Sequence, residues 1–253
     1  MNKILIVLTV VFMFSTSFFI SKKAEQQDSG EKTNTQRAFV PQPIKKPTVS
    51  TAEEIYSAIS FDGMNTLNPE VFKKAFLGFQ NLKKAGALDE NSNLLSICDF
   101  SLSSNTKRLW VIDVDKREVV FNSLVAHGKN TGEEFATKFS NIESSYQSSM
   151  GFYLTDVTYH GENGYSLKLL GMDNGYNDAA LKRAIVMHGA DYVSESFAAQ
   201  HKRIGRSWGC PAVPREIAQS LIDTIKEKNC LFIYYPDEKY LSSSKWLKSP
   251  ETI

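Results

Sequence analysis

The spacing of hydrophobic residues changes once along the chain, near residue 90. Before this point, apolar side chains recur every three or four residues, which predicts a helix with one apolar face. They are Val71, Phe72, Ala75, Phe76, Phe79 and Leu82. Asn68 and Pro69 are typical of a helix start, and Gly86 is typical of a helix end. We expect this apolar face to pack against the domain that follows.

From residue 94 onwards the hydrophobic runs are short and typical of β-strands. Two of these runs, 109–114 and 118–125, flank three polar residues and predict a hairpin. Pro214 is expected to open a second amphipathic helix. Further strands are expected at residues 151–158, 166–170, 184–188 and 231–235. The pattern therefore predicts a mostly β domain with flanking helices, of the α+β class.

The first 50 residues follow neither pattern. Residues 1–23 join Lys3 to an apolar run from Ile4 to Ile20, which is typical of an export signal peptide. The run also approaches the length of a membrane-spanning helix, so an uncleaved N-terminal anchor that tethers the protein to the membrane is the alternative. Either form places the remaining chain outside the cytoplasm, in the periplasm or cell envelope. Residues 24–50 are rich in Lys, Gln, Thr and Pro and are expected to form a disordered linker.

The remainder divides into a helical extension (51–90), a main domain (91–240) and a C-terminal tail (241–253). Within the main domain, the polar and Ser-rich stretch 130–147 predicts a long functional loop. The charge is balanced, with 29 Lys and Arg against 28 Asp and Glu. This balance gives no basic footprint for nucleic acid. The oligomeric state has no signature in the sequence.

The three cysteines lie in different contexts. Cys98 and Cys230 lie within or beside apolar strands, whereas Cys210 is surrounded by Ser, Trp, Gly and Pro. An exported protein can hold a disulfide, so a Cys98–Cys230 pair is the alternative to two free core cysteines. In both cases Cys210 is left as the candidate reactive thiol.

A histidine accompanies this thiol. A short apolar strand ends at His188-Gly189, and the turn 207–210, with the sequence Ser-Trp-Gly-Cys, precedes the predicted second helix. The thiolate is the attacking form of a cysteine, and a nearby imidazole can remove the thiol proton. Glycines let the backbone approach a reacting carbonyl and offer N–H donors to it. A position near a helix start is expected to lower the thiol pKa further.

The pairing of His188-Gly189 with Ser207-x-Gly209-Cys210 resembles the signature of the L,D-transpeptidase catalytic domain. Within that family it is most similar to the divergent, YkuD-like branch of murein L,D-transpeptidase catalytic domain proteins. Five further segments resemble this branch in the same order, namely residues 127–132, 139–141, 149–153, 166–167 and 175–178. The resemblance covers residues 94–235 and implies a β-sandwich catalytic domain with the cysteine in a cleft.

The resemblance also implies a mechanism on the stem peptides of peptidoglycan. Cys210 would attack the carbonyl after the diamino acid of a tetrapeptide stem, release D-Ala and keep the rest as a thioester. An amine of a neighbouring stem, or water, would then resolve the thioester. His188 would act as base and later as acid, while the backbone carbonyl of Gly189 orients its ring. No cofactor and no metal are implied.

The residues on either side of the cysteine carry two departures from the family signature. Ser207 would brace the turn, and backbone N–H groups around Trp208, Gly209 and Cys210 would hold the oxyanion. The common signature has a histidine where this chain has Trp208, and often an arginine where it has Ala212. The missing arginine leaves the usual substrate-carboxylate contact without a residue. Two candidates to replace it are Arg206 and Arg203.

Three more residues are expected to shape the cleft and contact substrate: His127, Tyr153 and Asp191. Other functions stay open at this point. An L,D-carboxypeptidase would use the same thiol, and a non-catalytic module would bind peptidoglycan without turning it over. A zinc peptidase would draw its ligands from His127, His160, His188 and Cys210. However, the chain has neither an HExxH motif nor paired CxxC spacing.

Overall fold

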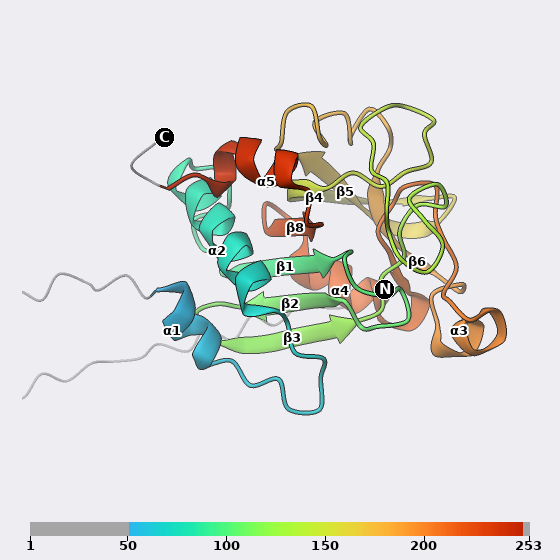
Figure 1. Cartoon of the computed structure of the whole chain (residues 1–253), viewed down its shortest axis with the longest axis horizontal. Helices are drawn as coiled ribbons and strands as arrows, with labels where there is room; N and C mark the ends of the chain where they lie inside the picture. Colours follow the sequence, from blue (N-terminus) through green and yellow to red (C-terminus); the bar gives the residue numbers. More distant parts are fainter. Residues whose placement is uncertain (1–50, 250–253) are drawn as a thin grey trace, which may run out of the picture. The chain divides into compact units, whose positions relative to one another are not determined.

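The computed structural model describes residues 51–249, so the predicted signal or anchor and the predicted linker lie outside the described residues. Eight strands form one sheet in the order β3-β2-β1-β8-β4-β5-β6-β7 (Figure 1). The strands are β1 (Leu94–Asp99), β2 (Leu109–Asp113), β3 (Glu118–Ser123), β4 (Gly151–Gly161), β5 (Gly164–Gly171), β6 (Val186–Ala190), β7 (Ala212–Pro214) and β8 (Cys230–Tyr234). The helices are α1 (Ala52–Ser57), α2 (Pro69–Lys84), α3 (Glu195–His201), α4 (Arg215–Ile225), α5 (Glu238–Ser243) and the 3₁₀ helix η1 (Lys245–Leu247). The prediction of a mostly β fold with flanking helices is confirmed.

The hairpin of β2 and β3 forms where two hydrophobic runs on either side of three polar residues predicted it. The last strand does not lie at an edge of the sheet. Instead β8 is inserted between β1 and β4, parallel to β1 and antiparallel to β4. A parallel neighbour comes from a distant part of the chain, so local sequence could not place this strand.

The two ends of the sheet approach each other through the segment that follows β3. The N–H of Ala126 donates to the carbonyl of Ala212 in β7 at 2.8 Å. This hydrogen bond links the segment that follows the edge strand β3 to the other edge strand, β7. The long loop that begins after Ala126 therefore starts beside the turn that carries Cys210.

Helices cover the two faces of the sheet separately. The buried side of α2 packs on β1 and β8, with Asn68 as N-cap and Gly86 at a positive φ of 68° after the helix, as predicted. In contrast, α4 packs on β5, β6 and β7. Cys98 belongs to the core beneath α4, whereas Cys230 belongs to the core beneath α2. The two thiols thus point to opposite faces and are free, so the alternative of a Cys98–Cys230 disulfide is wrong.

The segments at both ends of the described range belong to the same compact unit as the sheet. Trp246, in the expected tail, is 5% exposed, and its indole N–H donates to the carbonyl of Met172 at 2.8 Å. The amide of Asn81 in α2 donates to the carbonyl of Trp246, also at 2.8 Å. A buried tryptophan thus holds the chain as far as η1 onto α2.

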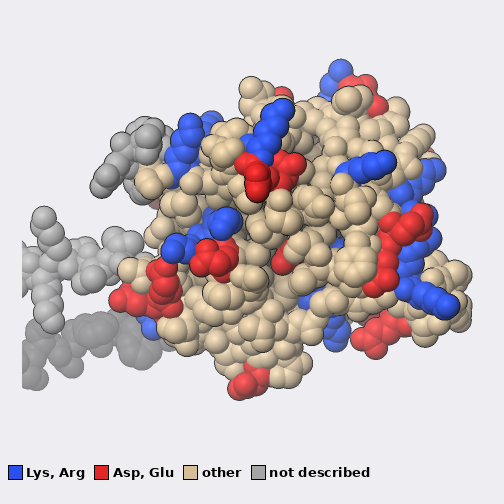
Figure 2. Space-filling view, in the orientation of Figure 1, with Lys and Arg blue, Asp and Glu red and all other residues tan. Residues whose placement is uncertain are grey.

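The surface carries mixed charge. On the face shown in Figure 2, basic and acidic side chains are interspersed among larger areas of other residues. Of the helices between residues 51 and 249, none combines the length and the apolar character that crossing a membrane requires.

Candidate active site

Cys210 and His188 line the same cavity, which has a volume of about 630 Å³. Strands β6 and β7 run parallel, with His188 opposite Ala212, and this register brings the turn before β7 alongside β6. The cavity is also lined by Tyr159, Gly161, Glu162, Asn163, Arg183, Ala184, Ile185, Val186, Tyr192, Arg206, Ser207 and Trp208. The fold therefore brings together the two residues singled out by their chemistry.

The turn 207–210 is held by the hydroxyl of Ser207. This hydroxyl donates to the carbonyl of Cys210 at 2.6 Å and accepts from the N–H of Gly209 at 3.0 Å. Gly209 has a φ of +129°, and a Cβ there would lie 2.8 Å from the carbonyl oxygen of Gln147. Only glycine satisfies both conditions. Ser207 thus sits where a brace of the turn was expected, while the Trp208 side chain is 71% exposed.

One expected oxyanion donor is occupied. The N–H of Gly209 already bonds Ser207, so it is not directed at a ligand. Within residues 51–249, the N–H groups of Trp208 and Cys210 make no hydrogen bond. These two groups are therefore the available donors in the turn.

The surroundings of the Cys210 thiol favour its protonated form. Burial raises the pKa of Cys210, although a bond from the N–H of Val186 to Sγ at 3.5 Å acts in the opposite direction. The thiol donates weakly to the carbonyl of Ala184 at 3.8 Å. The expected effect of a nearby helix start is wrong, because β7 separates Cys210 from α4, which begins at Arg215. The dipole effect of a helix is confined to its first turn.

His188 meets the requirements of such a base. It lies in the middle of β6 rather than at its end. Its Nδ1 is 3.1 Å from the carbonyl of Gly189, and since a carbonyl only accepts, Nδ1 carries the proton and Nε2 the lone pair. Burial lowers the pKa of His188, so the imidazole is neutral at pH 7. No other residue of the described range bonds to Nε2, which leaves this atom available.

Two expected substrate contacts are not at the surface of the cavity. His127 and Tyr153 are both fully buried. The Nδ1 of His127 accepts from Arg108 at 2.7 Å, and its Nε2 lies 3.1 Å from the carbonyl of Glu133. The hydroxyl of Tyr153 donates to the carbonyl of Ser149 at 3.0 Å. These positions correct the expectation that the two side chains touch substrate, because a side chain without exposed surface supports the site from behind.

The third expected contact also lies away from the cavity. Asp191 is exposed, and its carboxylate pairs with the guanidinium of Arg215 at 2.5 Å. It is absent from the residues that line the cavity. The position of Asp191 just after a strand was therefore not sufficient to predict that it contacts substrate.

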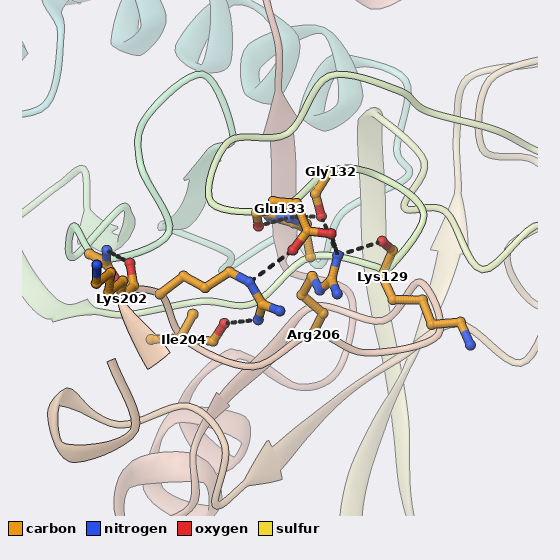
Figure 3. A network of polar contacts seen from close by, with 9 residues as sticks. Lys129, Gly132, Glu133, Lys202, Ile204 and Arg206 are labelled. Carbon is orange, nitrogen blue, oxygen red and sulfur yellow. Dashed lines mark hydrogen bonds and ion pairs between the residues drawn. The ribbon is translucent and has the colours of Figure 1, made fainter. Parts of the chain in front are cut away.

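The two arginines considered as replacements share one acidic partner, Glu133, and Figure 3 labels this residue together with Arg206. Arg206 lines the cavity and donates to one carboxylate oxygen of Glu133 at 2.7 Å, while Arg203 donates to the other at 3.0 Å. Arg206 also donates to the carbonyls of Lys129 and Gly132, both at 3.0 Å. Arg203 is not among the lining residues, so only Arg206 has the position for a substrate contact.

With this geometry established, residues 63–234 match the family described as L,D-transpeptidase catalytic domain. The chain belongs to this family. Solved structures similar to it include an L,D-transpeptidase from Mycobacterium smegmatis, at 12% identity and a TM-score of 0.36, covering 57% of this chain and 59% of that one. The helical cell shape determining protein Pgp2 from Campylobacter jejuni, a K307A mutant, matches at 14% identity and a TM-score of 0.38, covering 65% and 55%.

An L,D-transpeptidase from Xylanimonas cellulosilytica matches at 13% identity and a TM-score of 0.34, covering 72% of this chain and 90% of that one. This chain spans less than two thirds of the M. smegmatis structure. No curated protein matches the chain.

The L,D-transpeptidase family signature did not reveal one residue of the cavity, Arg183. It lies three residues before β6 and lines the cavity with Cys210. In the sequence it follows the exposed Leu181 and Lys182 in a region without periodicity, so nothing marked it before the fold was known.

The zinc alternative lacks a ligand set in the folded domain. Between residues 51 and 249, no three His, Cys, Asp or Glu side chains gather as metal ligands would. His127 is engaged through both ring nitrogens, and His160 lies on the exposed part of β4.

Proposed function

We propose that this member of the L,D-transpeptidase family is a peptidoglycan acyltransferase that works through a thioester on Cys210. The observation that supports it most is the pairing within one cavity of a free thiol and a neutral imidazole whose Nε2 is available. A partly buried thiol with a raised pKa is mostly protonated at neutral pH. It therefore needs such a base in order to react.

In the first half-reaction, the Nε2 of His188 takes the thiol proton as Sγ attacks the carbonyl carbon after the diamino acid of a tetrapeptide stem. The N–H groups of Trp208 and Cys210 stabilise the oxyanion that forms. When the tetrahedral intermediate collapses, the C–N bond breaks and the imidazolium returns the proton to the leaving amine of D-Ala. A thioester on Cys210 remains.

In the second half-reaction, an amine of a neighbouring stem attacks the thioester and His188 takes its proton. The C–S bond breaks, and the thiolate recovers the proton from His188. Water as acceptor would give an L,D-carboxypeptidase with the same first half-reaction. We propose the transpeptidase as the principal activity because the family is defined by it.

The substrate class implies that the protein acts in the cell envelope after export. The N-terminal segment is proposed as the export signal or as a tether to the membrane. The remaining alternative is a module that binds peptidoglycan without chemistry. It would leave the free thiol in the cavity and the oriented imidazole without a role.

The experiment incubates the full chain with purified disaccharide-tetrapeptides and analyses the products by mass spectrometry, with Cys210→Ala as the control. A cross-linked dimer that has lost one D-Ala supports the transpeptidase. A monomeric tripeptide without dimer supports the carboxypeptidase. Unchanged muropeptides that nevertheless bind would leave only the binding module and would overturn the proposed activity.

A further inference from the structure

Arg183 is a half-buried guanidinium in the Cys210 cavity that has no acidic partner. None of the ion pairs formed within residues 51–249 includes it. Its Nε is buried without a hydrogen-bond partner, and burial lowers its pKa. A desolvated cation without a counter-charge is destabilising. This arrangement indicates a role other than stability.

Its remaining N–H groups all point to one loop, residues 140–149. Nη1 donates to the carbonyl of Ser140 at 2.8 Å and to the hydroxyl of Ser149. Nη2 donates to the carbonyl of Gln147 at 2.6 Å and to the hydroxyl of Ser145 at 3.1 Å. One side chain thus contacts four residues of this loop, and three of them, Ser140, Ser145 and Gln147, lie in the Ser-rich stretch 130–147 that was expected to be functional.

That loop contacts the backbone of the cysteine turn. The hydroxyl of Ser148 donates to the carbonyl of Gly209 at 3.0 Å and accepts from the N–H of Gly128 at 3.0 Å. The carbonyl of Gln147 approaches Gly209 so closely that a Cβ there would lie 2.8 Å from it. A displacement of the loop would therefore move the residue directly before the nucleophile.

The guanidinium also acts on the thiol through its charge. Burial dominates the pKa of Cys210 and raises it, but the positive charge of Arg183 opposes that shift. The charge of Arg183 has neutral partners in the resting protein, and it gains a negative one when Cys210 ionises.

We propose that Arg183 is a positioning residue for the nucleophile: it holds the loop 140–149 against the turn 207–210 and provides the counter-charge for the Cys210 thiolate. The inference rests on the proposed function only in taking Cys210 as the nucleophile. It assigns to Arg183 no contact with substrate, because its Nη groups are occupied and its Nε is buried.

The test compares full-length wild type with Arg183→Met and Arg183→Lys. Alkylation of Cys210 by iodoacetamide is followed from pH 6 to 10 by peptide mass spectrometry, together with thermal unfolding. In Arg183→Met the alkylation profile shifts to higher pH and the rate at pH 7.5 falls about three- to tenfold, because a lost neighbouring charge favours the neutral thiol. Arg183→Lys keeps the charge but cannot span four acceptors, so its profile shifts less while acylation by a muropeptide still slows.

Lys182→Met is the matched control. Lys182 is the preceding residue, is exposed, and pairs with Glu143 of the same loop at 2.5 Å. This control removes one positive charge and one loop contact without reaching the cavity, so its alkylation profile should equal that of wild type. An equal shift in Lys182→Met and Arg183→Met, or no shift in either, would overturn the proposal.

Two other results, a variant that does not fold and a wild type without muropeptide product, can each be distinguished from a failure of this proposal. If Arg183→Met fails to fold, Ser148→Ala tests the mechanical link alone, and an unchanged acylation rate in that variant would contradict the role of the loop. If wild type forms no muropeptide product, the proposed function fails. The alkylation profiles still decide the role of Arg183, since alkylation needs no substrate.

Discussion

The chain contains two buried His-Gly pairs, and their environments differ in one respect that decides their chemistry. His127 uses both ring nitrogens, accepting from Arg108 at one and donating to backbone carbonyls at the other. His188 uses only Nδ1, toward the carbonyl of Gly189, and lines the cavity with Cys210. Burial lowers both pKa values, that of His127 to about 4. A neutral buried histidine becomes a candidate base only when one nitrogen is left available.

The glycines of the two pairs also differ. A Cβ on Gly128 would lie 2.5 Å from the carbonyl oxygen of Tyr146 and 2.9 Å from the Cα of Gly209. A Cβ on Gly189 would instead lie 2.8 Å from the Cβ of Ala218 in α4. The first pair therefore supports the cysteine turn from outside the cavity, and the second pair belongs to the site itself.

The largest effect is expected for His188→Gln. Removal of the base should slow acylation of Cys210 by a muropeptide or a carbapenem at least about 100-fold. Intact-protein mass spectrometry over time measures this rate. In the variant, the residual rate should rise with pH toward the raised thiol pKa, whereas wild type should stay active down to below pH 6.5 because His188 remains neutral there. A wild-type rate in His188→Gln would remove this residue from the mechanism.

Gly128→Ala is expected to have the next largest effect. The added methyl group must displace the backbone of Gly209 or of Tyr146, and a small misplacement of a nucleophile slows acylation about 10- to 100-fold. Gly189→Ala is the matched variant, with its main loss in thermal stability through α4. Equal acylation rates for Gly128→Ala and wild type would show that the turn does not depend on this close approach.

His127→Phe should separate stability from chemistry. Arg108 is fully buried and would lose one acceptor, so the free energy of unfolding should fall by about 1.5–3 kcal/mol. Chemical denaturation measures this loss. Cys210 acylation in the folded variant should remain close to wild type, and a loss as large as that of His188→Gln would contradict the distinction between the two histidines.

The smallest effect is a pH dependence of stability. The pKa of His127 lies below its unfolded value of 6.5, so only the unfolded chain binds the proton as pH falls below 6.5. Stability is thus complete above pH 6.5 and should decrease by about 2 kcal/mol between pH 6.5 and 5. His188 adds to the same slope. Denaturation at several pH values should give a shallower slope for His127→Phe, and an unchanged slope would exclude His127 as its source.

The sequence predicted those features of the fold that depend on residues close together in the chain. The start of α2 at Asn68, the hairpin of β2 and β3 and the long polar loop all follow from neighbouring residues. The Cys98–Cys230 alternative failed because strand register, which places these thiols on opposite faces, depends on the insertion of β8.

In the candidate site too, features set by neighbouring residues were predictable, and features set by contacts between distant residues were not. Short sequence motifs were enough to identify three candidate residues, namely Cys210, His188 and Ser207. The burial of Tyr153, the pairing of Asp191 with Arg215 and the role of Arg183 arise from residues far apart in the sequence. No periodicity or motif reports such contacts.

The most direct test of the account is the mass of the intact protein after brief exposure to a disaccharide-tetrapeptide, with the modified residue located by peptide mapping. If Cys210 is the nucleophile, the mass of the wild-type protein increases by that of the muropeptide minus D-Ala, and the adduct lies on Cys210. The adduct should be absent in Cys210→Ala and should form very slowly in His188→Gln. An adduct that persists in Cys210→Ala, or that maps to another residue, would contradict Cys210 as the nucleophile.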